Sequence, residues 1–294
     1  MRSFAHNSIQ LVSECALRPL PSNVVHVWHV NLRPRSPQSG TQLYKLLSPD
    51  EKKRAANYRS EREHRHFCQA RAALRITLAH YLNIPPAEVC FKFAPYGKPM
   101  LAEPSQRWLQ FNLSHSRDSV LIAIARDRLV GIDIEYLRPD LDVAHLAPYL
   151  FSPIERVQWQ RAAAAEQQRL FYQHWVCKQA YLKAIGGGLH SDPRFVLLSL
   201  PSRRAPQVEF RDICWQPFDS LRAPDRADGR NGSDWTMLLL PDDPDYIAAV
   251  AAAGAAISIE ERPFELLLRS GWDRFSEPSN FDRGQRHVGF FTQR

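Results

Sequence analysis

The sequence predicts a mixed α+β fold. Segments that alternate apolar with polar side chains, or that are short and apolar throughout, are typical of strands, and such segments lie at 26–32, 120–126 and 129–137. Longer segments with apolar residues at helical spacing cover 61–83 and much of 143–185. Of the 294 residues, 44% are hydrophobic and 23% are charged, which is typical of a globular chain with a substantial core.

The first elements have recognisable boundaries. Residues 1–22 are expected to form a loosely ordered leader, ahead of the strand at 26–32 and a loop rich in proline, serine and glycine at 33–40. Ser48 precedes a proline and two acidic residues. This is the order of an N-cap, a first-turn proline and first-turn acids, so a helix is expected to start there.

The rest of an N-terminal α+β subdomain, which we place at 23–128, follows this helix start. The helix over 61–83 ends before two consecutive prolines, which cannot continue a helix. Further strands are expected at 89–93, 111–116 and 120–126.

A C-terminal α+β subdomain is placed at 129–256. After the strand at 129–137, three helical segments cover 143–185, with breaks near Pro148 and at 151–153. Three glycines at 186–188 end the last of these helices, as glycine does at helix C-termini. Further strands are expected at 195–200, 208–215 and 235–240.

The alanine-rich run at 248–256 is open to two interpretations. Alanine has the highest helix propensity, but the run follows the turn-rich segment PDDPD, which favours a final strand to a similar degree. Residues 257–294 are treated as a C-terminal extension of unknown role.

Composition excludes several classes of protein. No apolar run approaches the roughly 18 residues that a membrane-spanning helix needs, and the N-terminus has no pattern of a secretory signal. The five cysteines are scattered and form no C-x-x-C pair, so neither a disulfide framework nor a zinc site is indicated. We expect a cytoplasmic protein.

The positive charge is unevenly distributed. The chain has a net charge of +7, and the segment 51–75 contains many more lysines and arginines than acidic residues. A basic surface of this kind attracts anions, so nucleic acid, a membrane, a phosphorylated small molecule or an acidic protein all remain open as partners.

An acidic pair lies in the segment GIDIE. On a strand, Asp133 and Glu135 project from the same face, while Ile132 and Ile134 point into a core. Two adjacent carboxylates repel each other unless a cation lies between them, and hard oxygen ligands suit Mg²⁺. The alternative is the solvated polar face of an edge strand.

The segment WVCKQAYLKA, at 175–184, reads as a helix with two lysines among apolar residues. Trp175, Gln179 and Lys183 share one stripe at i, i+4 and i+8, and Lys178 lies beside it. Two ammonium groups there suit a polyanion such as a diphosphate. The alternative is a buried amphipathic helix whose lysines reach the surface.

Two further segments carry polar residues. YGKPML presents Lys98 on a turn, and FNLSHS places Ser114 and His115 at the end of a strand. Neighbours on a strand point to opposite faces, so these two are poorly placed as a nucleophile and its base. Without a G-x-S-x-G elbow, a hydrolase is not favoured.

In order and spacing, GKPML, FNLSHS, VGIDIEYL and WVCKQAYLKA resemble the Sfp-type 4′-phosphopantetheinyl transferases. The resemblance extends from 47–54 to about Phe195, and less specifically to about residue 253. It implies two similar α+β halves related by a pseudo-twofold axis, with coenzyme A in the cleft between them. It also implies transfer of the phosphopantetheine arm of coenzyme A to a serine of an apo acyl or peptidyl carrier protein, with release of 3′,5′-ADP. The expected partners are therefore coenzyme A and an acidic carrier protein, not nucleic acid or membrane, and the expected state is a monomer.

The resemblance also assigns roles to individual residues. Asp133, Glu135 and the residue at position 179 would hold Mg²⁺, and Lys183 would neutralise charge on the departing phosphate. Lys178 would contact the diphosphate. Three further groups would bind phosphates, namely Ser114, His115 and Lys98, and the candidates for the 3′-phosphate are Arg54 and Arg71.

Gln179 departs from the family pattern, in which this position is a glutamate. An amide oxygen can coordinate a metal, but it carries no charge and accepts no proton at neutral pH. Either Asp133, Glu135 or a metal-bound water takes the proton in an active enzyme, or the chain binds coenzyme A or a carrier with little or no turnover. A nucleic-acid-binding module built on the basic segment is a third hypothesis, but no recognisable motif supports it.

Overall fold

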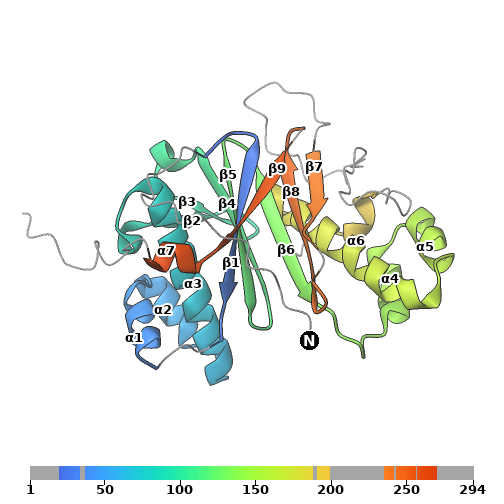
Figure 1. Ribbon diagram of the computed structural model, residues 1–294, viewed down its shortest axis with the longest axis horizontal. Coiled ribbons are helices and arrows are strands. Elements are labelled where there is room, and N and C mark those ends of the chain that lie inside the picture. Colours follow the sequence, from blue (N-terminus) through green and yellow to red (C-terminus); the bar gives the residue numbers. More distant parts are fainter. Residues whose placement is uncertain are drawn as a thin grey trace, which may run out of the picture.

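The computed structural model describes residues 20–33, 37–187, 191–198, 235–241, 243–255 and 257–269. Two β-sheets pack against each other, and a 22-residue helix covers the outer side of each (Figure 1). The fold is mixed α+β, as the sequence predicts. Among the described residues, no helix is long and apolar enough to cross a bilayer.

The first sheet has four strands in the order β4-β5-β1-β9. These are β1 (Val24–Asn31), β4 (Leu109–Ser116), β5 (Ser119–Arg126) and β9 (Ser258–Pro263). β9 runs parallel to β1, so the first part of the predicted C-terminal extension returns to the sheet of the N-terminal half. α3 (Glu61–Leu82) packs on the outer face of this sheet, and α7 (Glu265–Arg269) follows β9.

Smaller elements complete the N-terminal half. They are α1 (Pro37–Lys45), α2 (Pro49–Ala55), the 3₁₀ turns η1 (Pro86–Glu88) and η2 (Pro104–Gln106), and the hairpin of β2 (Phe91–Phe93) with β3 (Pro99–Leu101). The loop expected at 33–40 is wrong in its second part, because α1 begins at Pro37. The helix start at Ser48 is confirmed: its side chain accepts from the backbone N–H of Glu51, and the Glu51 carboxylate accepts from the backbone N–H of Ser48.

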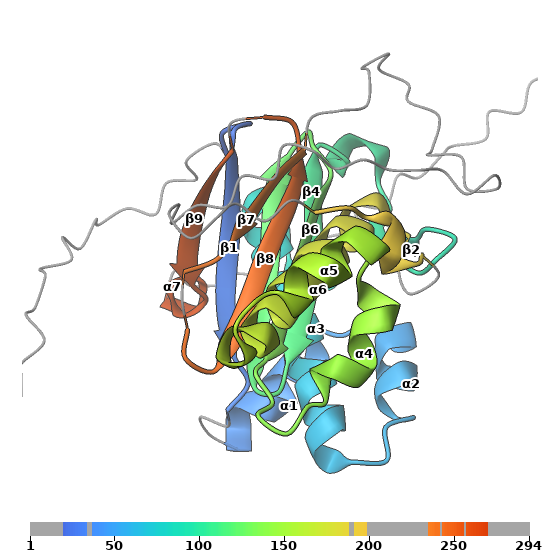
Figure 2. The ribbon, with the colours of Figure 1, turned by 90° about the vertical axis from the view of Figure 1, so that its right-hand side faces the viewer.

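The second sheet has the order β6-β8-β7 and is antiparallel. Its strands are β6 (Val130–Tyr136), β7 (Trp235–Leu239) and β8 (Tyr246–Ala253). α6 (Ala164–Ile185) lies on its outer face, and α4 (Val143–Leu150) and α5 (Pro153–Gln160) lie beside α6 (Figure 2). Gly186 ends α6 in a left-handed conformation at φ +79°, as the sequence predicts.

The alanine-rich run is the central strand β8, not a helix. β8 is hydrogen-bonded to a strand on each side, and both of its faces are buried. Ala249 and Ala251 face α6, whereas Ala248, Val250 and Ala252 face the first sheet. Small side chains let both neighbours approach closely, so tertiary packing overrides the helix propensity of alanine.

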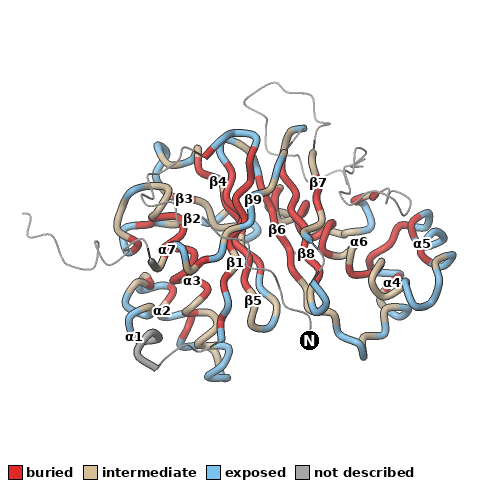
Figure 3. The backbone as a smooth tube through the Cα atoms, viewed as in Figure 1, coloured by how far each residue is buried: buried red, intermediate tan, exposed pale blue. Residues whose placement is uncertain are grey.

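The core has three main layers, one between α3 and the first sheet, one between the two sheets and one between the second sheet and α6. Most residues of the central strands are buried, and exposed residues gather on the peripheral helices (Figure 3). The strand expected at 195–200 is wrong at its start, where η4 (Pro193–Phe195) is a 3₁₀ turn. Residues 1–19, the strand expected at 208–215 and residues 270–294 lie outside the described residues.

Candidate functional site

The acidic pair of β6 lies on the strand face that α6 covers. Asp133 is 3% exposed and Glu135 is half-buried, while Ile132 and Ile134 point to the first sheet. Gly131 shares the face of the two acids. A Cβ atom at this glycine would lie 2.0 Å from the backbone oxygen of Ala180, so α6 passes very close to β6. The close approach brings the helix side chains to the carboxylates.

Asp133 is the centre of a polar cluster formed by three elements. The Ser114 hydroxyl, from β4, donates to Asp133 Oδ1 at 2.9 Å. The Lys183 ammonium, from α6, donates to the same carboxylate oxygen and to Ser114 Oγ, the latter at 2.8 Å. The structure thus brings together three of the residues that the sequence selects for the site.

The Asp133 carboxylate is not fully satisfied by the protein. Asp133 Oδ2 is buried and has no hydrogen-bond partner among the described residues. Burial raises the pKa of Asp133, although Lys183 opposes this rise. Burial also raises the pKa of Glu135, and the nearby charge of Asp133 adds to it. The environment of each carboxylate therefore favours a neighbouring cation or a bound proton. The oxygen Asp133 Oδ2 contacts neither Lys183 nor Ser114.

Gln179 lies on the stripe of α6 between Trp175 and Lys183, and it is 8% exposed. Among the described residues, no three His, Cys, Asp or Glu side chains converge on one point. Mg²⁺ in proteins commonly uses one or two carboxylates and completes its shell with water and substrate phosphates. Two carboxylates, one of which has an unpartnered oxygen, therefore fit this ion.

A cavity of about 220 Å³ adjoins Glu135, the second residue of the acidic pair. Glu135 and Ser116 contribute polar atoms to its wall, and an aromatic wall is formed by Phe171, Tyr172 and Trp175. The guanidinium of Arg117 lies over the ring of Tyr136, 3.3 Å from the centroid, and both residues also line the cavity. A substrate group that enters here would meet Glu135 directly.

The FNLSHS and GKPML segments supply two further candidate residues, His115 and Lys98. His115 follows Ser114 on β4 and is exposed as a residue, and partial burial of its imidazole together with the charge of Lys183 lowers its pKa. Lys98 donates to the backbone oxygens of Ala184 at 2.5 Å and Val130 at 3.3 Å, and burial lowers its pKa to about 8. Its ammonium binds the C-terminal end of α6 and the start of β6, where the helix dipole favours a cation. The expected contact of Lys98 with phosphate stays a prediction.

Lys178 is a correction to the expectation from sequence. Its side chain is fully buried, and its ammonium donates to Glu155 Oε2 at 2.7 Å and to the backbone oxygen of Leu150 at 2.9 Å. The pair lies in the core between α6 and α5, so Lys178 does not face the acidic pair. Lys178 and Lys183 both lie among apolar residues of the same helix, but their side chains leave the helix in different directions.

Arg54 and Arg71, the candidates for the 3′-phosphate, lie close enough for the charge of Arg54 to add to the burial that lowers the pKa of Arg71. Arg71 forms an ion pair with Glu51 at 2.6 Å, its side chain is 14% exposed, and its guanidinium lies over the ring of Phe91. Arg54 is exposed and lies over the ring of Phe67. Arg71 therefore braces α3 against α2, while Arg54 remains available at the surface.

Sequence reasoning missed two residues of β4 that contact β6. Asn112 Oδ1 accepts from the backbone N–H of Ile132 at 2.9 Å, and the Ser116 hydroxyl donates to Glu135 Oε2 at 3.2 Å. The signal that could have identified them is the spacing N-x-S-x-S, which puts three polar side chains on one face of a strand.

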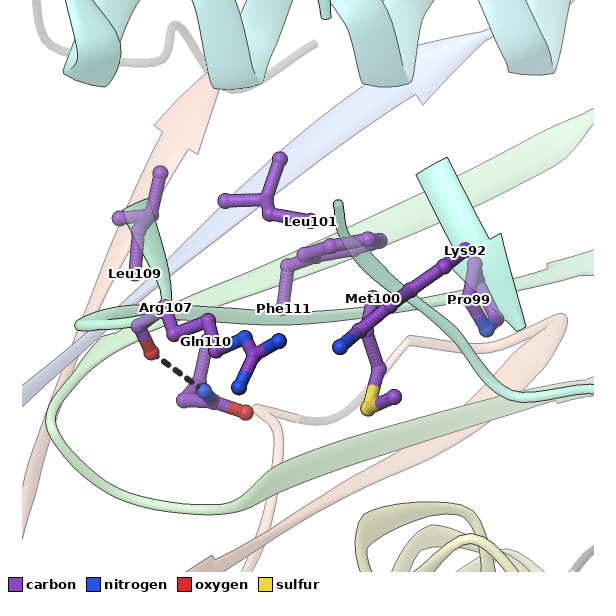
Figure 4. Close-up of a pocket in the computed structure, with 8 residues that line it drawn as sticks. All are labelled: Lys92, Pro99, Met100, Leu101, Arg107, Leu109, Gln110 and Phe111. Atoms are coloured by element: carbon purple, nitrogen blue, oxygen red, sulfur yellow. Dashed lines mark hydrogen bonds between the residues drawn. The ribbon is translucent and has the colours of Figure 1, made fainter. Parts of the chain in front are cut away.

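A smaller cavity of about 110 Å³ lies at the opposite end of β4 (Figure 4). Lys92, Met100, Arg107 and Gln110 line it, together with apolar residues of the β2–β3 hairpin and of β4. None of the residues predicted for the site contributes to this cavity.

Comparison with known proteins identifies the class to which this fold and site belong. The family model described as the 4′-phosphopantetheinyl transferase superfamily matches residues 129–251. The model described as the N-terminal part of 4′-phosphopantetheinyl transferases matches residues 33–127. The chain belongs to the 4′-phosphopantetheinyl transferase superfamily and is an enzyme that transfers 4′-phosphopantetheine to carrier proteins.

Individual relatives agree with this class. The chain is 34% identical over 237 residues to the 4′-phosphopantetheinyl transferase HetI of a Nostoc species, a match that covers 80% of this chain and 90% of that relative. It is 35% identical over 117 residues to the 4′-phosphopantetheinyl transferase gsp of Aneurinibacillus migulanus, covering 40% of this chain and 46% of the relative. The L-aminoadipate-semialdehyde dehydrogenase-phosphopantetheinyl transferase of Homo sapiens is 29% identical over 154 residues, or 49% of each chain.

Proposed function

We propose that this transferase uses coenzyme A as the donor and Mg²⁺ as the cofactor, and that it modifies a serine of an acidic acyl or peptidyl carrier protein. The released product is 3′,5′-ADP. The observation that supports this proposal most directly is the cluster of Asp133, Ser114 and Lys183, with the unpartnered oxygen of Asp133 beside it. A diphosphate and a divalent cation would together satisfy the acceptor and the donors of this cluster.

In the proposed reaction, the serine oxygen of the carrier forms a bond to the phosphorus of the phosphopantetheine arm. The bond between that phosphorus and the oxygen of the departing 3′,5′-ADP breaks. Mg²⁺, when bound by Asp133, Glu135 and Gln179, supplies positive charge against the phosphate oxygens. Lys183 stabilises the negative charge that develops on the leaving phosphate, and Ser114 holds Lys183 and Asp133 together.

The proton of the serine hydroxyl needs an acceptor. Gln179 cannot take it, because a neutral amide has no basic oxygen at neutral pH. Glu135 lines the cavity next to the site, so its carboxylate lies within reach of a hydroxyl or a water that enters there. Glu135, directly or through a bound water, is therefore our candidate for the proton acceptor.

The remaining features of the proposal concern the whole molecule. Each half combines a sheet with a 22-residue helix, which supports a pseudo-twofold relation with the coenzyme A cleft between the halves. Domain limits at 23–128 and 129–256, a monomeric state and a cytoplasmic location stay predictions. The basic segment around α2 and α3, with Arg54 at the surface, would attract both coenzyme A and an acidic carrier.

The central experiment is incubation of the protein with coenzyme A, Mg²⁺ and a panel of apo carrier proteins, followed by mass spectrometry of the intact carriers. We expect one carrier to gain the mass of one phosphopantetheine arm, and chelation of Mg²⁺ to abolish the gain. If no carrier gains mass while calorimetry shows binding of coenzyme A, the chain is a binding relative without turnover.

Gln179→Glu separates these two outcomes. The added carboxylate should lower the Mg²⁺ concentration needed for half-maximal activity, because it completes a set of three carboxylates. If the wild type transfers slowly for lack of this group, the variant should be faster by about 10²–10⁴-fold. Gln173→Glu, which adds the same charge to a different face of α6, is the matched control. Equal behaviour of both variants would show that position 179 is not part of the site.

A further inference from the structure

The two edge strands β4 and β6 are joined by side chains instead of by a backbone ladder. β6 is at the edge of the second sheet and β4 is at the edge of the first. The backbone N–H groups of Ile132, Ile134 and Tyr136 donate to side-chain oxygens of β4, at 2.9, 3.4 and 3.0 Å. Their acceptors are, in the same order, Asn112, Ser114 and Ser116. We call these three side chains the β4 ladder.

The β4 ladder has a repeating pattern that includes the acidic pair. Ser114 accepts from the N–H of Ile134 and donates its proton to Asp133, the residue before it. Ser116 accepts from the N–H of Tyr136 and donates its proton to Glu135, again the residue before. Each serine hydroxyl thus binds the backbone and the carboxylate of β6 at once, because a hydroxyl has one donor and two acceptor sites.

Asn112 occupies the position where no carboxylate exists. It accepts from Ile132, and the residue before Ile132 is Gly131, which the close passage of α6 requires. An asparagine here aligns β6 without orienting an acid. The β4 ladder therefore contains two kinds of residue. Asn112 only aligns the strand, whereas the two serines also orient carboxylates.

We propose that Ser116 is a positioning residue of the transferase reaction, which acts by holding the Glu135 carboxylate for the metal. The inference rests on the proposed function, because it concerns a carboxylate assigned there to Mg²⁺. Partners of metal-binding carboxylates typically contribute to metal affinity as well as to geometry. Ser116 touches neither the donor nor the acceptor in this account and acts through Glu135 alone.

The test measures binding of Mn²⁺, as a stand-in for Mg²⁺, to the full-length protein with coenzyme A present, by electron paramagnetic resonance. Ser116→Ala should weaken Mn²⁺ binding about tenfold, and Ser116→Thr, which keeps the hydroxyl, should restore it. Ser119→Ala is the matched control, because Ser119 is the register partner of Ser116 across the same hairpin. It should leave Mn²⁺ binding within about twofold of the wild type.

Asn112→Ala distinguishes positioning from simple support of the fold. It should lower the unfolding midpoint but weaken Mn²⁺ binding much less than Ser116→Ala. Equal loss of Mn²⁺ affinity in the two variants, or no difference between Ser116→Ala and Ser119→Ala, would overturn the proposal.

A double-mutant cycle keeps this inference separate from the proposed function. Ser116→Ala, Glu135→Gln and the double variant are unfolded with urea in the presence of a chelator. We expect the two effects to be non-additive, because each variant removes one partner of the same hydrogen bond. Additive effects would refute the positioning contact, whereas a wild type that transfers nothing and binds no Mn²⁺ would instead refute the proposed function.

Discussion

Gly131→Ala tests the close contact between β6 and α6 on which the site depends. The added Cβ atom would lie 2.0 Å from the oxygen of Ala180 and 2.5 Å from the nitrogen of Ala184. Both are backbone atoms of α6, so no side-chain rotation can relieve the overlap. An ordinary contact begins near 3.4 Å, and the strand and helix would therefore have to separate by more than about 1 Å.

The expected cost follows from this geometry. Overpacking of a core costs about 1–3 kcal/mol, and more where rigid elements must move. Because the clash is with the backbone of a 22-residue helix, we expect a loss of about 3 kcal/mol or more in the free energy of unfolding. The shift would also separate Lys183 from Asp133, so metal binding and transfer should fall in the protein that remains folded.

The assay is urea unfolding followed by tryptophan fluorescence, with Gly97→Ala as the matched control. Gly97 has φ +83° and no atom within 4 Å of an added Cβ, so this variant carries backbone strain without a clash. Its cost should be about 1–2 kcal/mol. A Gly131→Ala protein that is as stable as the wild type, or more stable than Gly97→Ala, would refute the close approach of α6 to β6.

Two further predictions concern lysines. Lys178→Met should reduce the free energy of unfolding by about 3–5 kcal/mol, because it leaves Glu155 buried without its partner. Lys183→Met should abolish transfer, because it removes the ammonium that neutralises the leaving phosphate in the proposed reaction. If Lys178→Met is as stable as the wild type and raises the KM for coenzyme A, the claim that Lys178 serves to stabilise the fold would be refuted. For Lys98, burial lowers the pKa from 10.5 to about 8, so the charged form costs stability below pH 8 and this cost disappears as the pH rises toward 10.5. The stability of the wild type relative to Lys98→Met should therefore increase by up to about 3 kcal/mol between pH 7 and pH 10 in urea unfolding, and a constant difference would contradict the lowered pKa.

The sequence was sufficient where local chemistry decides the structure. The cap at Ser48 and the stop at Gly186 depend on residues within one helical turn, and both are confirmed. The acidic pair of β6 is equally local, since strand alternation alone places Asp133 and Glu135 on one face. The order of four short motifs was enough to indicate the transferase family, which the family models confirm.

Other features depend on partners that are distant in the chain. β8 is a strand although alanine favours helices, because two strands, a helix and a sheet surround it. The pairing of the first part of the extension, β9, with β1 joins residues more than 200 positions apart, which no local pattern reveals.

The two lysines of α6 show most clearly the difference between features that local sequence determines and features that depend on distant partners. Lys178 and Lys183 look alike in sequence, but five residues turn a helix by about 140° beyond a full turn. One ammonium therefore meets Glu155 in the core, and the other meets Asp133 at the site. The sequence by itself determined the helix, its end and the charged residues that it carries. Only the tertiary structure decided which lysine lies beside the acidic pair, because the neighbours of each helix face come from segments that the chain brings together on folding.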